Sequence, residues 1–64
     1  MTARERVEVE LNELRTKIKK IEDFADRGKM QGLSWKAAAL LQTQYYLMLA
    51  YADTLEARIA IWKD

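Results

Sequence analysis

The sequence predicts an all-α protein: a two-helix antiparallel hairpin that assembles into a homo-oligomeric helical bundle. The chain has no proline, and its two glycines both fall between Arg27 and Leu33, which leaves two uninterrupted segments. In each segment apolar residues recur at alternating spacings of three and four. A 64-residue chain without Cys or His lacks disulfides and the usual zinc ligands, so oligomerisation is the remaining way to enlarge its core.

The first segment predicts a helix over about residues 3–27. Its start, Thr2-Ala3-Arg4-Glu5, fits a capping box, in which a Thr and a Glu side chain satisfy each other's backbone N–H groups. Gly28 is well placed for the left-handed conformation that ends many helices. One face carries an apolar stripe formed by Val7, Leu11, Leu14, Ile18, Ile21 and Ala25.

A linker over residues 28–34 separates this helix from a second one, predicted over about residues 35–63. Ser34 is a suitable N-cap for the second helix. The two helices match in length, and the tight connection predicts that they fold back on each other. Residues 1–64 therefore form a single hairpin domain.

The second helix is apolar on several sides. The heptad period continues at Leu41, Gln44, Met48, Tyr51, Leu55, Arg58 and Trp62. Further apolar area comes from Leu40, Tyr45, Leu47, Leu49, Ile59 and Ile61. A helix of this kind is surrounded by protein, so we expect it at the centre of a bundle of identical subunits, with a tetramer favoured. The alternative, a monomer with a large exposed apolar patch, would be prone to aggregation.

Charge and composition exclude several classes of function. The net charge is +1, from 11 Lys and Arg against 10 Asp and Glu, so no global field attracts DNA, RNA or an anionic membrane. The sequence shows no signal-peptide pattern and no apolar run of membrane-spanning length, which predicts a cytoplasmic protein. Without His, Cys, a Gly-rich phosphate loop or a metal-binding carboxylate motif, we expect no catalysis, no cofactor and no metal.

Three polar residues interrupt the heptad period of the second helix. Gln44, Tyr51 and Arg58 stand seven residues apart and so point the same way; we call them the polar ladder. One interpretation is that they specify register and oligomeric state. The other is that the ladder, doubled by a symmetry mate, lines a polar pocket in which a phosphate or carboxylate partners the arginine. The Tyr ring would then stack on a base, and Gln would offer a donor and an acceptor.

A basic cluster supports two interpretations as well. It comprises Arg15, Lys17, Lys19, Lys20, Arg27 and Lys29. It could form an anion site, or a solvated face with helical ion pairs from Glu13 to Lys17 and from Asp23 to Arg27. The aromatic residues Trp35, Tyr45 and Tyr46 likewise fit either a core or interface role or a ligand platform.

Two family resemblances bear on function. Residues 11–18 superficially resemble the first helix of chorismate mutases, but those enzymes need a third helix for which this chain has no residues.

A broader likeness spans about residues 5–60. The pattern Leu40-Leu41-x-x-Gln44-x-x-x-Met48-x-x-Tyr51-x-x-x-Leu55-x-x-Arg58-Ile59 resembles a family of very short phage proteins related to a crAss-like phage product. In the first helix Arg6-Val7, Glu10-Leu11, the repeat from Leu14 to Ile21 and Phe24 are similar too. The Gly- and Met-containing linker departs from that pattern, as does Trp35 followed by Ala37-Ala38-Ala39.

The phage-protein resemblance implies immune evasion: a tetrameric sponge that sequesters cyclic oligonucleotide signals of the CBASS defence in the host cytoplasm without cleaving them. A cyclic dinucleotide offers two phosphates and two bases, and its symmetry would suit a pocket on a two-fold axis. The roles are then phosphate binding by Arg58, stacking by Tyr51 or Tyr45, hydrogen bonding by Gln44, and assistance from Lys19 or Lys20. The alternative is a helical interaction module that docks on a host protein.

Overall fold

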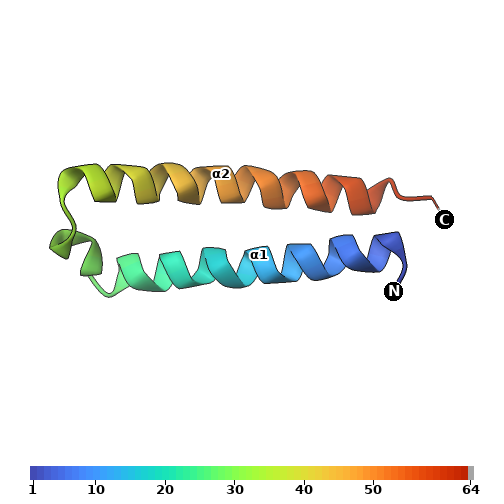
Figure 1. Cartoon of the computed structure of the whole chain (residues 1–64), viewed down its shortest axis with the longest axis horizontal. Coiled ribbons are helices and arrows are strands. Elements are labelled where there is room, and N and C mark those ends of the chain that lie inside the picture. The colour runs from blue at the N-terminus through green and yellow to red at the C-terminus, as the bar shows by residue number, and fades with distance from the viewer. Residues whose placement is uncertain (64) are drawn as a thin grey trace.

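The computed structural model describes residues 1–63, which form two long helices joined by a short turn. Helix α1 spans Ala3–Asp26, a 3-10 helix η1 spans Lys29–Gly32, and helix α2 spans Trp35–Ala60. The two long helices run antiparallel along a rod of 47 × 16 × 15 Å, so the N- and C-terminal ends lie together at the end opposite the turn (Figure 1). The predicted two-helix hairpin is confirmed, with α2 ending three residues before the predicted Lys63.

Local hydrogen bonds fix the helix ends. The Thr2 hydroxyl accepts from the Glu5 backbone N–H at 3.1 Å, and the Glu5 carboxylate accepts from the Thr2 N–H at 3.2 Å, which confirms the capping box. Gly28 has a φ of 72°, the left-handed conformation that glycine adopts without strain. The Ser34 hydroxyl accepts from the Ala37 N–H at 3.2 Å and so caps α2. The short helix η1 inside the linker was not predicted.

The core between the helices is small. Its buried members are Val7, Leu11, Leu14 and Ile18 from α1 and Ala52 and Leu55 from α2. The half-buried side chains around them are Tyr45, Met48, Leu49, Ile59 and Trp62. Leu55 is the one fully buried side chain among the described residues. So few buried residues leave a chain of this size short of apolar burial.

The face of α2 that meets α1 follows a heptad frame that differs by one residue from the period through the polar ladder. Met48, Leu55 and Trp62 lie against the core as expected, but they alternate with Tyr45, Ala52 and Ile59. The polar ladder is exposed one residue away from these positions, so it is not part of the face that packs on α1. The two heptad frames lie one residue apart and share Met48, Leu55 and Trp62. In the frame through Ala52, the small side chain permits a closer approach of α1, and the polar side chains stay hydrated.

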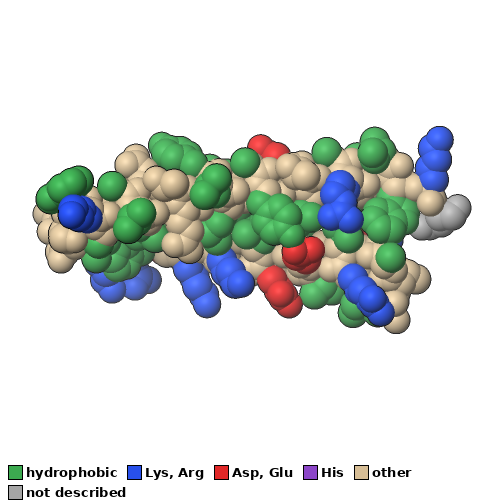
Figure 2. Space-filling view, turned by 45° about the horizontal axis from the view of Figure 1, so that its top comes forward, with side chains coloured by type: hydrophobic (Ala, Val, Ile, Leu, Met, Phe, Trp, Pro, Cys, Tyr) green, Lys and Arg blue, Asp and Glu red, His purple; other side chains and the backbone are tan. Residues whose placement is uncertain are grey.

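The remaining sides of α2 expose large apolar side chains. Trp35 is 78% exposed, Leu40 71%, Leu47 66% and the C-cap residue Ile61 77%. Figure 2 shows hydrophobic side chains spread along the α2 side of the rod. Exposed apolar area of this extent on so small a protein marks an interaction surface. Within residues 1–63, neither long helix has the length and apolarity needed to cross a membrane.

Candidate functional site

The structure separates the predicted site residues into three locations: two flanks of the hairpin and a groove near the turn. The polar ladder lies on one flank of α2, which we call the ladder flank. Tyr45 and Lys19 line a cavity on the other flank, the cavity flank. Lys20 lies in a separate groove near the turn, formed mainly by the end of α1. One chain therefore does not bring the predicted residues into a single pocket.

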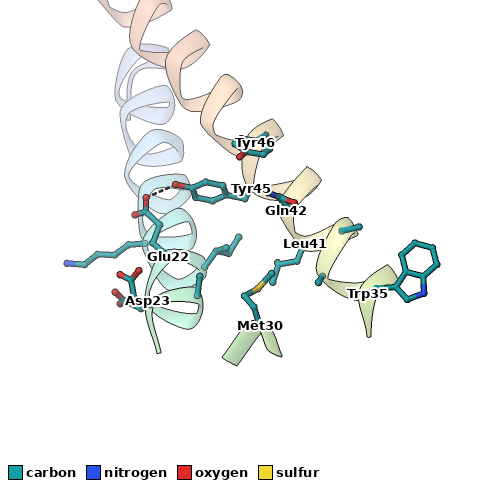
Figure 3. Close-up of a pocket in the computed structure, with 14 residues that line it drawn as sticks. Glu22, Asp23, Met30, Trp35, Leu41, Gln42, Tyr45 and Tyr46 are labelled. Atoms are coloured by element: carbon teal, nitrogen blue, oxygen red, sulfur yellow. Dashed lines mark hydrogen bonds between the residues drawn. The ribbon is translucent and has the colours of Figure 1, made fainter. Parts of the chain in front are cut away.

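The cavity on the cavity flank lies where α1 ends and α2 begins (Figure 3). Its volume is about 950 Å³, within the range of small-molecule sites. Aromatic side chains line it together with apolar ones, and Tyr45 and Tyr46 stand with ring centroids 5.7 Å apart. The apolar lining comprises Ile21, Ala25, Met30, Ala38, Ala39 and Leu41. In shape and apolar lining the cavity is suited to a planar ring.

The electrostatics of this cavity oppose an anionic ligand. Glu22, Asp23 and Asp26 line it against a single cation, Lys19. The Tyr45 hydroxyl donates a hydrogen bond to Glu22 at 2.7 Å, and this bond is the main reason why the pKa of Tyr45 is raised above its ordinary value. Desolvation and the charges of Glu22 and Asp26 add to that shift. A phosphate placed here would meet like charge, so Lys19 and Tyr45 are weaker candidates for a phosphate site than the sequence suggested.

The ladder flank has a different character. The Tyr51 hydroxyl donates a hydrogen bond to Glu10 of α1, and that bond is the largest cause of a raised pKa of Tyr51. The positive charge of Arg58 lowers the pKa of Tyr51 and so partly offsets this shift. Among residues 1–63, Arg58 has no ion-pair partner within 4.0 Å. Gln44 makes only a long contact, 3.9 Å from its amide nitrogen to the sulfur of Met48. An exposed aromatic ring and an unpaired guanidinium thus share this flank.

A third feature, which we call the basic groove, lies at the turn and was missed as a unit by sequence reasoning. Lys20, Arg27 and Lys29 line it with Phe24 and one carboxylate, Asp23, around a volume of about 250 Å³. The spacing of Lys20, Phe24 and Arg27, four and then three residues, places them on one helix face and could have indicated the groove. Three cations facing one carboxylate make it compatible with an anion.

The predicted helical ion pairs of the basic cluster do not form. Neither Glu13 with Lys17 nor Asp23 with Arg27 comes within 4.0 Å, so that prediction was wrong. The ion pairs recorded among residues 1–63 are Arg4–Glu8, at 3.3 Å, and Arg15–Glu56, which joins α1 to α2. Arg15 is therefore structural, whereas the three cations of the basic groove stay unpaired in the described part of the chain.

These features define a class of protein: a small helical hairpin that exposes aromatic and charged side chains on its flanks. The model of the Sequestin family matches residues 1–61, and the chain belongs to that family. The family name indicates sequestration of a molecule. No curated protein and no solved structure matches the chain.

Proposed function

We propose that this member of the Sequestin family binds and sequesters a cyclic dinucleotide signal of bacterial anti-phage defence, and does so without catalysis. The family name supports the act of sequestration. The likeness of the second helix to short phage proteins supports the kind of ligand and a place of action in the host cytoplasm. Sequestration requires only that the ligand be bound tightly and kept from its receptor, so no reacting group is needed.

The observation that carries this proposal is the pairing of Tyr51 and Arg58 on the ladder flank. The Tyr51 side chain is 43% exposed and offers a flat face on which a nucleobase can stack. Arg58 is exposed and has no ion-pair partner within residues 1–63, so its planar fork of donors is available to a phosphate. The aromatic ring can stack on the base of a nucleotide, and the guanidinium can bind its phosphate.

The site becomes enclosed only in an assembly. On one chain Tyr51 and Arg58 stand on the outside of a helix, where a ligand would stay mostly solvated, whereas small-molecule sites bury most of their ligand. The exposed apolar residues of α2, among them Leu40 and Leu47, supply the reason to associate. We therefore place the binding site between subunits of a homo-oligomer, with a tetramer as the favoured state.

Isothermal titration calorimetry against cyclic di- and trinucleotides and their linear counterparts tests this proposal. We expect heat from at least one cyclic dinucleotide at micromolar ligand. Arg58→Ala should weaken that binding by about tenfold or more while leaving the oligomer intact. Arg15→Ala is the matched control, because Arg15 is held by Glu56 and should leave binding unchanged. If no cyclic nucleotide in the panel releases heat, the proposal is rejected.

A second candidate function is docking on a host protein, and the exposure of Trp35, Leu40 and Leu47 favours it. The same residues that we assign to self-association would then contact the partner. A tagged chain that stays monomeric, binds no cyclic nucleotide and retains one host protein from a lysate in stoichiometric amount would select this function over sequestration.

A further inference from the structure

A second heptad stripe runs along the exposed surface of α2, and two of its residues, Ala39 and Tyr46, also border the cavity on the cavity flank. It consists of Lys36, Ala39, Thr43, Tyr46, Ala50 and Asp53, spaced alternately by three and four residues, and we call it the outer stripe. All six residues are exposed in the single chain. Such a spacing is the pattern by which one helix packs along another. The outer stripe is thus a ready seam for a further helix.

The distribution of charge along the outer stripe indicates which helix can pack against it. No charged side chain occurs from Ala37 to Ala52, whereas the stripe begins at the cation Lys36 and ends at the anion Asp53. Between these ends the stripe carries small residues, Ala39 and Ala50, which allow two helix backbones to approach closely. A neutral stripe with a cation at one end and an anion at the other is complementary to a second copy of itself that runs in the opposite direction.

We propose that two copies pair through α2 in an antiparallel arrangement that sets Lys36 of each copy opposite Asp53 of the other. The same register sets Ala39 opposite Ala50 and Thr43 opposite Tyr46, so small residues meet small ones and the aromatic ring lies beside a short side chain. A two-fold axis makes each contact twice, so two Lys36–Asp53 pairs form. A parallel pairing in register would instead bring Lys36 against Lys36 and Asp53 against Asp53, which is repulsive.

This register decides which subunits form the ligand site. That consequence rests on the proposed function, whereas the pairing itself does not. Arg58 follows Asp53 by five residues, about 7.5 Å along the helix axis, and therefore lies level with the turn of the other copy. A two-fold axis in the interface keeps both ladder flanks on the same side of the pair. Arg58 of the second copy then lies beside the turn of the first, where Lys29 borders the basic groove, while Tyr51 lies level with the first turns of α2.

The distances along the rod also set the stoichiometry. At 1.5 Å per residue, the two Arg58 residues of such a pair lie roughly 40 Å apart, too far for one cyclic dinucleotide to touch both. Each ligand therefore lies at one end of the pair, bound by Arg58 of one copy and Lys29 of the other. This arrangement gives one ligand per chain, in contrast to the single ligand on the two-fold axis that the symmetry of a cyclic dinucleotide suggests.

Cysteine cross-linking tests the register directly, because the natural chain contains no cysteine. Lys36→Cys and Asp53→Cys are made separately, one of them with an added mass tag, then mixed and oxidised. A disulfide requires Cα atoms about 4.4–6.8 Å apart, a distance that facing positions of closely packed helices reach. We expect the mixed, tagged–untagged species to dominate and neither variant alone to cross-link efficiently. Efficient cross-linking of Lys36→Cys with itself, or no mixed product, would overturn the register.

Charge reversal provides a second measurement that does not depend on disulfide geometry. Lys36→Glu and Asp53→Lys should each weaken association several-fold in sedimentation equilibrium, and the double variant Lys36→Glu/Asp53→Lys should restore it. Both positions are exposed in the single chain, so neither change should unfold the hairpin. A double variant that associates no better than the single variants contradicts the pairing.

The ligand-binding consequence is tested with cyclic dinucleotide as the calorimetric probe. Lys29→Ala should lower the affinity about as much as Arg58→Ala, whereas Lys17→Ala, outside the basic groove, should not. One ligand should bind per chain. If the mixed cross-link forms but no nucleotide binds, the pairing stands and the proposed function fails. If nucleotide binds but no mixed cross-link forms, the function stands and this register is wrong.

Discussion

The two faces of α2 use the same heptad spacing for different purposes. The inner face packs Met48, Ala52 and Leu55 against the apolar stripe of α1, and Leu55 is completely buried there. The outer stripe, which includes Ala39 and Ala50, is exposed along its whole length. Large interlocking side chains hold the hairpin together, whereas small residues with a charge at each end are suited to a partner that arrives after folding. One helix can thus serve both as half of a core and as an interface.

The largest expected effect belongs to the inner face. Leu55→Ala leaves a cavity in a core of six buried residues and should cost about 2–5 kcal/mol of the free energy of unfolding. For a chain this small, that loss should leave a large part of the protein unfolded. Denaturant unfolding followed by circular dichroism measures the effect. Leu40→Ala is the control, because Leu40 is 71% exposed and its loss should leave the hairpin folded.

Placing a charge on the outer stripe should break association without unfolding the hairpin. Ala50→Glu would bury an unpaired carboxylate between two copies, a change that costs several kcal/mol and should weaken association by more than a hundredfold. Sedimentation velocity reports the shift to the monomer. Thr16→Glu adds the same charge on the solvent side of α1 and should leave the oligomer unchanged. Equal behaviour of the two variants would argue against the outer stripe as an interface.

Loss of the free guanidinium should affect the ligand more than the fold. Arg58→Ala removes charge-assisted hydrogen bonds worth about 1.5–3 kcal/mol, so the dissociation constant should rise by about tenfold or more. Calorimetry at constant salt measures the change. Lys19→Ala serves as the comparison, because Lys19 lies in the acidic cavity and should matter less. A larger loss for Lys19→Ala than for Arg58→Ala would move the site to the cavity flank.

The smallest expected effect is the dependence of stability on pH from the two tyrosines bonded to carboxylates. The pKa values of Tyr45 and Tyr51 are raised, chiefly by hydrogen bonds to Glu22 and Glu10. A raised pKa in the folded state contributes stability that is complete below the ordinary pKa of 10 and is lost as the pH rises through the raised value. The melting temperature of the wild type should therefore fall more steeply than that of Tyr45→Phe/Tyr51→Phe as the pH rises above the ordinary tyrosine pKa of 10. An equal dependence of the melting temperature on pH in the two proteins would contradict this contribution of the tyrosines to stability.

The hairpin follows from local signals in the sequence. The Thr2–Glu5 capping box, Gly28 at the turn and the stripe from Val7 to Ile18 each specify their part independently of the rest of the fold. The choice of packing face on α2 could not be predicted in the same way. Two possible heptad frames on α2 differ by one residue. The frame through Ala52 packs against α1 because it lets the two helices approach closely. That close approach depends on both helices together, so it cannot be recognised in the sequence of α2 alone.

The candidate site was harder to predict for a related reason. Tyr45 and Tyr51 differ by six residues, and the sequence alone did not show that they project to opposite flanks. The structure assigns Tyr45 to a cavity lined by carboxylates and Tyr51 to a flank with Arg58, which has no ion-pair partner within residues 1–63. The basic groove combines side chains from the end of α1 with Lys29 beyond the turn, so only the folded turn brings them together.

Native mass spectrometry of the protein incubated with a cyclic dinucleotide tests the central claim most directly, because one spectrum reports the assembly, the number of ligands and the mass of each ligand. We predict an oligomer that carries one intact ligand per chain, and release of the unaltered ligand when the protein is denatured. Arg58→Ala should give the same oligomer with clearly less ligand bound at the same ligand concentration. A ligand-free monomer, or a ligand released in cleaved form, would contradict sequestration between subunits.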